Sequence, residues 1–185
     1  MAFIGKALRP LRAGTKKLAI LEPAFADAPR LDVRSEAFSD GGPMASSFAG
    51  SEGVSPPLRW TGVPPSTKSI AIVVQDVDVP LPAPLVHVVA YGIGPETGQL
   101  PAAALPRAGS KTPVAQIALG RGVAGEAYAP PTPIPGHGPH RYVFQVFALD
   151  FAPTFAAAPD EKQLVEAMRG HVTACGSVTG THEAT

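Results

Sequence analysis

The stretch Tyr142-Val-Phe-Gln-Val-Phe-Ala-Leu149 is apolar at every position except Gln145. A second run, Ser69-Ile-Ala-Ile-Val-Val-Gln75, is apolar at all five of its inner positions. Apolar runs of this length, rich in β-branched and aromatic residues, are typical of strands that are covered on both faces. We therefore predict that both stretches are central strands of a sheet in a β-sandwich.

Shorter segments of the same character recur between turn-forming residues. They predict further strands at 31–38, 57–60, 85–93 and 114–119, and the central run extends over 141–150. The connections at 63–66, 79–84 and 128–136 are rich in proline, which fixes φ and donates no hydrogen bond, so these must be stiff loops. The chain is thus expected to be mainly β, as an antiparallel β-sandwich.

One helix is marked by its end signals. Asp160 suits an N-cap, Gln163 follows three residues later as in a capping box, and Gly170 provides a C-terminal stop. The buried stripe of this C-terminal-region helix would consist of Leu164, Val165 and Met168. The tail at 172–180 is expected to return as a final strand.

The N-terminal residues predict a second, short helix. Its apolar face would contain Phe3, Ile4, Leu8 and Leu11, and we expect this face to pack on the domain, with contact to a second subunit in a homodimer as the alternative. Basic residues interrupt this segment, so neither a signal peptide nor a membrane span is expected. We predict an N-terminal extension over 1–30 and one domain over 31–185.

The composition narrows the class of protein further. Of 185 residues, 22 are Pro and 19 are Gly while 45% are hydrophobic, which suits a loop-rich β protein better than a disordered chain. Lys+Arg and Asp+Glu both total 15, so no broad basic field is expected to gather nucleic acid or an anionic bilayer. The single Cys175 allows no internal disulfide, which favours a reducing, cytoplasmic location.

Two segments place polar groups beside strands that should be buried. In the first, Asp76 and Asp78 follow an apolar strand and His87 lies inside the next one. Burying an imidazole costs free energy unless it finds a hydrogen-bond partner, and either carboxylate could supply one. The simpler interpretation is a core histidine tied to a carboxylate with no further role.

In the second segment, Gly136 and Gly138 precede a strand that begins with His140, Arg141 and Tyr142. Alternate strand residues share a face, so His140 and Tyr142 should lie together while Arg141 points to the other side. Two donors beside a glycine loop suit a tetrahedral anion. A polar turn before a hairpin is the alternative, and the adjacent His137 could face solvent or border the site.

These segments resemble a known family. Ser55-Pro-Pro-Leu-Arg-Trp60, Asp76-Val-Asp-Val-Pro80, His87 and Gly136-His-Gly-Pro-His-Arg-Tyr142 occur in the order and at the separations typical of bacterial phosphatidylethanolamine-binding proteins, also called Raf kinase inhibitor-like proteins. The resemblance runs from about residue 31 to the C-terminus.

The resemblance implies an antiparallel β-sandwich with an anion pocket at one end. The implied ligand-binding residues are Asp76, His87, Thr132, His140 and Tyr142. The implied supporting residues are Trp60, Asp78, Pro80, Gly136, Gly138 and Arg141. The family also implies a cis peptide bond between Val79 and Pro80.

The sequence departs from the family pattern at three places. Val77 replaces the usual proline between the two aspartates, Val88 replaces the tryptophan after the strand histidine, and a usual glycine is absent from Tyr128-Ala-Pro-Pro131. The change at Val88 implies that the pocket lacks one aromatic wall.

Together these features predict a binding protein rather than an enzyme, with no cofactor and no bound metal. Its ligand would be a phosphate-like small molecule or a phospholipid head group, held by bonds from His87, His140 and Tyr142. Asp76 would orient a histidine, keep that histidine protonated or share a proton with the ligand. Modulation of a partner protein is a further role that the family implies. The alternatives are a metal-dependent hydrolase using Asp76, His87 and His140, and a serine hydrolase, for which no G-x-S-x-G elbow occurs.

Overall fold

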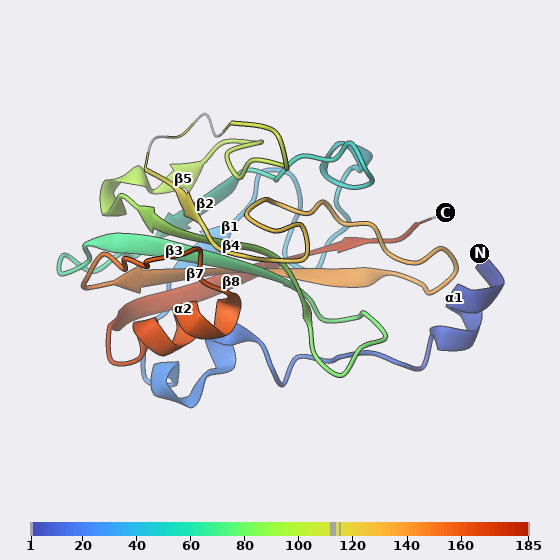
Figure 1. The fold of residues 1–185 in the computed structure, drawn as a ribbon, viewed down its shortest axis with the longest axis horizontal. Coiled ribbons are helices and arrows are strands. Elements are labelled where there is room, and N and C mark those ends of the chain that lie inside the picture. Colours follow the sequence, from blue (N-terminus) through green and yellow to red (C-terminus); the bar gives the residue numbers. More distant parts are fainter. Residues whose placement is uncertain (1, 112–113, 115, 185) are drawn as a thin grey trace.

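The computed structural model describes residues 2–111, 114 and 116–184, and within this part of the chain eight strands form two antiparallel sheets. The larger sheet has the order β6-β4-β3-β7-β8, and the smaller has the order β1-β2-β5 (Figure 1). The strands are β1 (Asp32–Arg34), β2 (Leu58–Thr61), β3 (Ser69–Asp76), β4 (Leu85–Ile93), β5 (Gln99–Leu100), β6 (Ala118–Leu119), β7 (His140–Leu149) and β8 (Val172–His182). The mainly β, antiparallel sandwich predicted from the sequence is confirmed.

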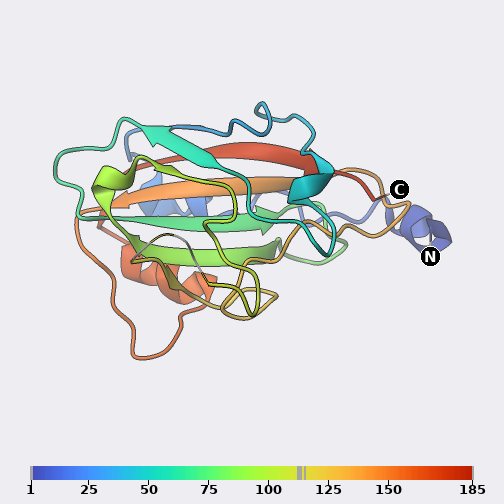
Figure 2. The same cartoon turned by 90° about the horizontal axis from the view of Figure 1, so that it is seen from above.

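The two predicted central strands lie side by side in the middle of the larger sheet. All eight residues of β3 are buried, and in β7 only Arg141 is exposed. One face of this sheet packs against the smaller sheet through residues such as Trp60, Val74 and Phe144. The other face is covered by α2 (Glu161–Met168) and by the N-terminal chain, which form a third, partial layer below the larger sheet in Figure 1. Figure 2 shows the strands of the larger sheet from the side of the smaller sheet.

The helix signals in the sequence predicted α2 correctly. The Asp160 side chain accepts from the Gln163 N–H at 2.9 Å, and the Gln163 side chain accepts in return from the Asp160 N–H. Gly170 has a φ of 78°, a left-handed conformation that glycine adopts without steric cost. The predicted stripe of Leu164, Val165 and Met168 is buried, and the tail returns as β8.

Two of the predicted strands are shorter than expected. The segment at 31–38 contributes only β1, and the segment at 114–119 contributes only β6, while residue 115 lies outside the described residues. Sequence patterns fix the type of an element more reliably than its ends, because pairing partners decide where a strand stops.

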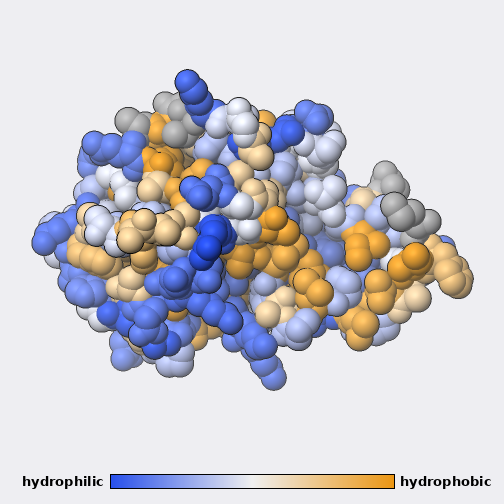
Figure 3. Space-filling view, in the orientation of Figure 1, coloured by the Kyte–Doolittle hydropathy of each residue, from blue (hydrophilic) through white to orange (hydrophobic). Residues whose placement is uncertain are grey.

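The N-terminal helix is present as α1 (Ala2–Leu8), but the prediction that its apolar face packs on the domain is wrong. Phe3 is 84% exposed, Ile4 60% and Leu11 54%, and apolar surface gathers over α1 in Figure 3. The helix instead turns Gly5 toward the domain. A Cβ atom at Gly5 would lie 2.1 Å from the Pro135 carbonyl oxygen, so the two backbones approach more closely than any larger residue allows.

The chain after α1 is anchored in the core. Ile20 and Phe25 pack under the larger sheet, although both belong to the predicted extension over 1–30. The Gln145 side chain accepts from the Ile20 N–H at 2.8 Å, and the Gln75 side chain accepts from the Ala19 N–H at 2.9 Å. Gln145, the one polar residue within the central run, therefore accepts a hydrogen bond from a backbone N–H that the N-terminal chain buries there. Among the described helices, none has the length and apolarity needed to span a bilayer.

Candidate functional site

The pairing of β3 with β7 brings the two polar segments together. Asp76, the last residue of β3, lies opposite Tyr142 of β7 in an antiparallel register. His140 and Tyr142 point to the same buried face and their rings stack with centroids 6.4 Å apart, whereas Arg141 points the other way and is half exposed. The predicted distribution of these three side chains between the two faces is confirmed.

His87 reaches the same face through an irregularity in β4. Val74 pairs with Val88 and the next residue, Gln75, pairs with Val86, so His87 is an extra residue on its strand. A bulge of this kind breaks the strict alternation of side chains and re-aims one of them. The His87 ring consequently meets the Tyr142 ring edge to face, with centroids 5.1 Å apart.

These side chains border a pocket of about 370 Å³ at the end of the larger sheet. The polar part of its lining consists of Asp76, His87, Thr132, His140 and Tyr142, the five predicted ligand-binding residues. The apolar part comes mostly from the proline-rich loops and includes Val79, Pro80, Leu81, Leu85, Val123, Pro130, Pro133 and Ile134. Thr132 is exposed at the edge, and its hydroxyl donates to the Pro130 carbonyl at 2.9 Å.

Two buried polar atoms at this pocket, His87 Nε2 and Tyr142 Oη, have no hydrogen-bond partner among the described residues. His87 Nδ1 lies 2.7 Å from the Ala129 carbonyl, which can only accept, so Nδ1 carries a proton and Nε2 carries a lone pair in the neutral ring. Burial lowers the pKa of His87, outweighing the opposing effects of this hydrogen bond and of Asp76. Burial also raises the pKa of Tyr142, and the nearby charge of Asp76 adds to the effect, so the hydroxyl keeps its proton.

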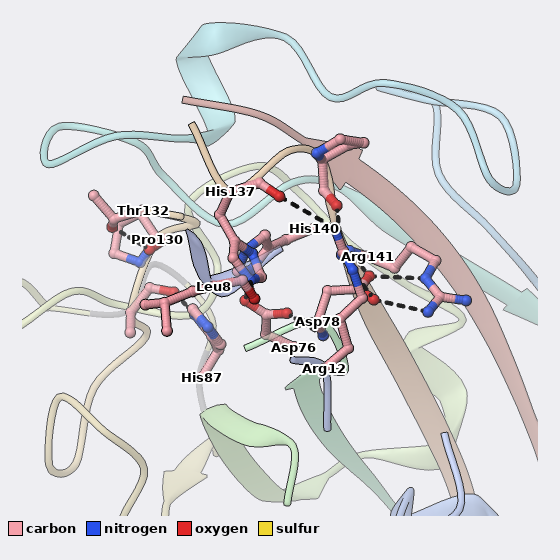
Figure 4. A network of polar contacts seen from close by, with 12 residues as sticks. Leu8, Arg12, Asp76, Asp78, His87, Pro130, Thr132, His137, His140 and Arg141 are labelled. Carbon is pink, nitrogen blue, oxygen red and sulfur yellow. Dashed lines mark hydrogen bonds and ion pairs between the residues drawn. The ribbon is translucent and has the colours of Figure 1, made fainter. Parts of the chain in front are cut away.

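His140 belongs to a chain of hydrogen bonds that leads away from the pocket (Figure 4). Its Nδ1 lies 2.7 Å from Asp76 Oδ2, and its Nε2 lies 2.7 Å from His137 Nδ1. His137 Nε2 in turn lies 2.9 Å from the carbonyl oxygen of Leu8 on α1. The other Asp76 oxygen accepts from the Asp78 N–H at 2.8 Å, so the orientation of both carboxylate and imidazole is fixed.

The number of protons in this chain follows from the number of bonds. Three hydrogen bonds join Asp76, His140, His137 and the Leu8 carbonyl, and each needs one proton. Two neutral imidazoles supply only two, because each carries a single N–H. The intact series of hydrogen bonds therefore contains a third proton. Wherever that proton resides, the net charge of Asp76, His140 and His137 together is zero.

This geometry corrects two expectations about the histidines. His140 does not present a free donor to the pocket, because both of its ring nitrogens are already bonded. His137 neither faces solvent nor lines the pocket, since it is fully buried beneath α1. The sequence placed His137 three residues before His140, but its partner Leu8 is 129 residues away and gave no local signal.

Asp78 supports the site from the opposite side of the loop. Its buried carboxylate meets Arg141 Nε at 2.8 Å and Arg12 Nη1 at 3.0 Å, and it accepts from the Arg141 N–H. Burial alone would raise the pKa of Asp78, but the hydrogen bonds from Arg141 and Arg12 outweigh it and lower the pKa to about 2. Asp78 and Arg141, both predicted as supporting residues, thus form an ion pair, and Arg12 of the N-terminal segment joins it.

The remaining supporting residues divide into two groups. Gly136 and Gly138 adopt φ values of 82° and 98°, and the Gly136 carbonyl accepts from Arg9 at 2.8 Å, so their loop faces the N-terminal chain. Trp60 is buried between the two sheets and is not part of the pocket lining.

The predicted cis bond between Val79 and Pro80 is wrong, because every peptide bond among the described residues is trans. The trans isomer of an X–Pro bond is favoured by about 0.5–1 kcal/mol unless the surroundings demand otherwise. Here the Val79 carbonyl accepts from the Ala13 N–H at 2.9 Å, a contact that the trans chain provides.

The arrangement does not favour the hydrolase alternatives. The described residues contain no group of three or more His, Cys, Asp or Glu side chains placed to hold a metal ion. No serine lines the pocket as far as the described residues show, and the Thr132 hydroxyl is bonded to a backbone carbonyl. Two buried polar atoms, His87 Nε2 and Tyr142 Oη, remain unbonded at this pocket among the described residues.

The proton count of the histidine chain can be measured. We expect ¹⁵N NMR of the imidazoles and ¹³C NMR of the Asp76 carboxyl at neutral pH to find three protons, one in each hydrogen bond of the series. His171, which lies on the surface 2.8 Å from Asp150, is outside the series and serves as the control for the imidazole signals. An ionised Asp76 beside two neutral imidazoles at neutral pH would contradict the count.

Substituting Asp78→Asn removes the charge that two guanidinium groups share. We expect the free energy of unfolding at neutral pH to fall by about 3 kcal/mol, as for other broken buried ion pairs. Because the folded pKa is about 2 and the unfolded value is about 3.9, the stabilisation is present above the unfolded value and is lost as the pH falls toward 2. Urea denaturation of both proteins should therefore give curves that converge in acid. Asp32→Asn, at an exposed pair with Arg34, should cost less than about 1 kcal/mol; an equal loss for both variants would contradict the assignment.

Comparisons with known proteins agree with this fold. Residues 34–183 match the family model of phosphatidylethanolamine-binding protein. A UPF0098 protein of Chlamydia muridarum is 33% identical over 161 residues, covering 83% of this chain and 99% of that protein.

Two solved structures are also similar. A putative phosphatidylethanolamine-binding protein homologue from Chlamydia trachomatis has a TM-score of 0.73 at 30% identity, covering 85% of this chain and all of the other. YbcL of E. coli has a TM-score of 0.71 at 30% identity, covering 84% of this chain and 99% of the other. Family members are generally binding proteins, which agrees with a receptor-like pocket. The chain belongs to the phosphatidylethanolamine-binding protein family.

Proposed function

We propose that the pocket bordered by Asp76, His87, His140 and Tyr142 binds a small phosphate-bearing anion. The observation that carries the proposal is that His87 and Tyr142 both line this pocket, while His87 Nε2 and Tyr142 Oη are buried polar atoms without a hydrogen-bond partner among the described residues. A buried polar group that is left unbonded costs about 1–3 kcal/mol, so a ligand that bonds to both recovers this cost. The phosphate would belong either to a free ester or to a phospholipid head group.

His87 Nε2 and Tyr142 Oη require opposite hydrogen-bonding groups on the ligand, one donor and one acceptor. Tyr142 keeps its proton and donates to an anionic oxygen, while the neutral His87 ring accepts a proton at Nε2. A singly ionised phosphate monoester offers both, because it has anionic oxygens and one P–OH. Asp76 does not repel the anion as a bare carboxylate would, since the third proton of the histidine chain neutralises it.

A phosphodiester has no P–OH, so the same site would bind it differently. His87 would have to take a proton from solution and donate it to the diester oxygen, and the bound negative charge would favour this protonation. The apolar wall of Leu81, Leu85 and Ile134 would then lie beside the ester substituents. The two sources of phosphate are therefore distinguished by whether binding takes up a proton.

Isothermal titration calorimetry with a phosphate monoester tests the site. We expect Tyr142→Phe to weaken binding by about 10- to 100-fold, the loss of one charge-assisted hydrogen bond, and His87→Gln to weaken it at least as much. The matched controls are Tyr91→Phe, on the opposite face of the sheet, and His171→Gln, at the far end of β7. Both controls should bind like the unsubstituted protein, and a Tyr142→Phe variant with unchanged affinity would refute the proposal.

The pH dependence follows from the lowered pKa of His87. For glycerophosphoethanolamine as a diester probe, we expect uptake of up to one proton per ligand near neutral pH, and an affinity that rises as the pH falls toward the His87 pKa. Calorimetry in two buffers with different ionisation enthalpies measures this uptake, which His87→Gln should abolish. Diester binding with no proton uptake and no pH dependence would show that His87 is not the contact.

A further inference from the structure

The balanced total charge of the chain conceals an uneven distribution. Residues 1–21 contain five basic side chains and no acidic one, whereas residues 22–185 contain ten basic and fifteen acidic side chains. The five are Lys6, Arg9, Arg12, Lys16 and Lys17, and all are exposed. The sequence-based expectation that the chain has no basic field therefore holds for the total but not for this segment, which also lies outside the residues matched by the family model.

The same segment exposes large apolar side chains. Phe3, Ile4 and Leu11 are each more than half exposed, and they alternate along the chain with Lys6 and Arg9. Figure 3 shows apolar surface over α1. A segment that combines exposed aromatic and aliphatic residues with basic ones, and has no acidic residue, has the composition of elements that lie in the interface of an anionic bilayer.

Contacts with both pocket loops fix the segment in place. Arg12 donates to the carbonyls of His137 and Pro139 on one loop, and the N–H groups of Ala13 and Gly14 donate to Val79 and Val77 on the other. The Lys17 ammonium group donates to the Pro82 carbonyl. The basic and apolar side chains are thus held beside the pocket, where the lining residues Leu81 and Val123 are themselves about half exposed.

We propose that residues 3–17 dock the protein on the surface of an anionic lipid bilayer, with Phe3, Ile4 and Leu11 entering the head-group region. The exposed basic side chains face the lipid phosphates, and the rim residues Leu81 and Val123 bring the pocket close to the same surface. This docking does not depend on what the pocket binds.

Charge decides between this partner and a second copy of the chain. A two-fold dimer through α1 places the same patch on both subunits, so the basic side chains of one copy meet those of the other without an acidic residue from the segment, although Arg12 is paired with Asp78 of its own subunit. Nucleic acid offers phosphates to the basic side chains but leaves Phe3, Ile4 and Leu11 without an apolar partner. An anionic bilayer offers both phosphates for the basic side chains and an apolar region for Phe3, Ile4 and Leu11.

Flotation of the full chain with vesicles tests the proposal. We expect the protein to float with vesicles of phosphatidylcholine and phosphatidylglycerol, to float less as salt rises, and to stay unbound with phosphatidylcholine alone. Phe3→Ser combined with Ile4→Ser should lower the partition coefficient about tenfold or more. Lys6→Glu should lower it about tenfold, because it reverses one charge near the surface.

Matched controls separate docking from loss of fold and from the pocket. Lys68→Glu, an exposed lysine at the opposite end of β3, and Leu21→Ser, on the side of α2, should each leave the partition coefficient within about twofold. Thermal unfolding and monoester affinity of the Phe3→Ser/Ile4→Ser variant should match those of the unsubstituted protein. Failure of monoester binding with intact vesicle binding would affect only the proposed pocket function.

Three results would overturn the docking proposal. The first is an absence of flotation with anionic vesicles, or flotation that the α1 substitutions do not change. The second is a lipid-free dimer that Phe3→Ser/Ile4→Ser converts to monomer, which would assign the apolar face to a second copy. The third is equally tight, salt-sensitive binding to a DNA duplex that the apolar substitutions leave unchanged, which would show that charge alone is recognised.

Discussion

The antiparallel register of β3 and β7 is the constraint on which the site depends. Eight consecutive pairs, from Ser69 with Leu149 to Asp76 with Tyr142, run without an irregularity, whereas the pairing of β3 with β4 contains two and that of β7 with β8 contains one. A slip of one residue would turn His140 and Tyr142 to the other face and place Arg141 in the pocket. The slip would also exchange the side chains that β7 packs into the two apolar layers, and it would turn Gln145 away from the Ile20 N–H toward the smaller sheet.

The polar residues at the end of this strand pair divide into those that hold the site and those left for a ligand. Asp76, His140 and His137 bond to one another and to the backbone, so their orientations are set before anything binds. A buried network of this kind is stable only when its members are satisfied, and here the third proton completes it. The two atoms outside the network, His87 Nε2 and Tyr142 Oη, belong to residues that line the pocket and have no hydrogen-bond partner among the described residues. For the proposed ligand, affinity would come from preorganisation, since little ordering would remain to oppose binding.

The N-terminal segment contributes to the same rigidity although it lies outside the family match. It spans the two loops that form the pocket, and through Leu8 it closes the histidine chain that begins at Asp76. Its apolar side chains at Phe3 and Ile4 stay on the surface, because Gly5 makes the close approach to the domain, while Arg9, Arg12 and Lys17 bond to domain carbonyls with side chains that remain exposed. One side of this short segment thus contacts the pocket loops, and its other side exposes apolar and basic side chains.

The sequence by itself determined the elements and the faces of the central strands. The apolar runs identified β3 and β7, the capping residues identified α2, and the two-residue alternation placed His140 with Tyr142 and apart from Arg141. These features are local, since they depend on side-chain period and on hydrogen bonds between residues three or four apart.

Only the tertiary structure decided how the site is completed. The bulge that turns His87 toward Tyr142 is a property of two paired strands, so the period of one strand could not reveal it. Both His140 nitrogens are engaged, Nδ1 by Asp76 and Nε2 by His137, and His137 is held in turn by the Leu8 carbonyl of α1, 129 residues before it. The exposure of Phe3 and Ile4 likewise depends on the backbone approach at Gly5, because an amphipathic pattern shows which residues share a face but not which face meets the domain.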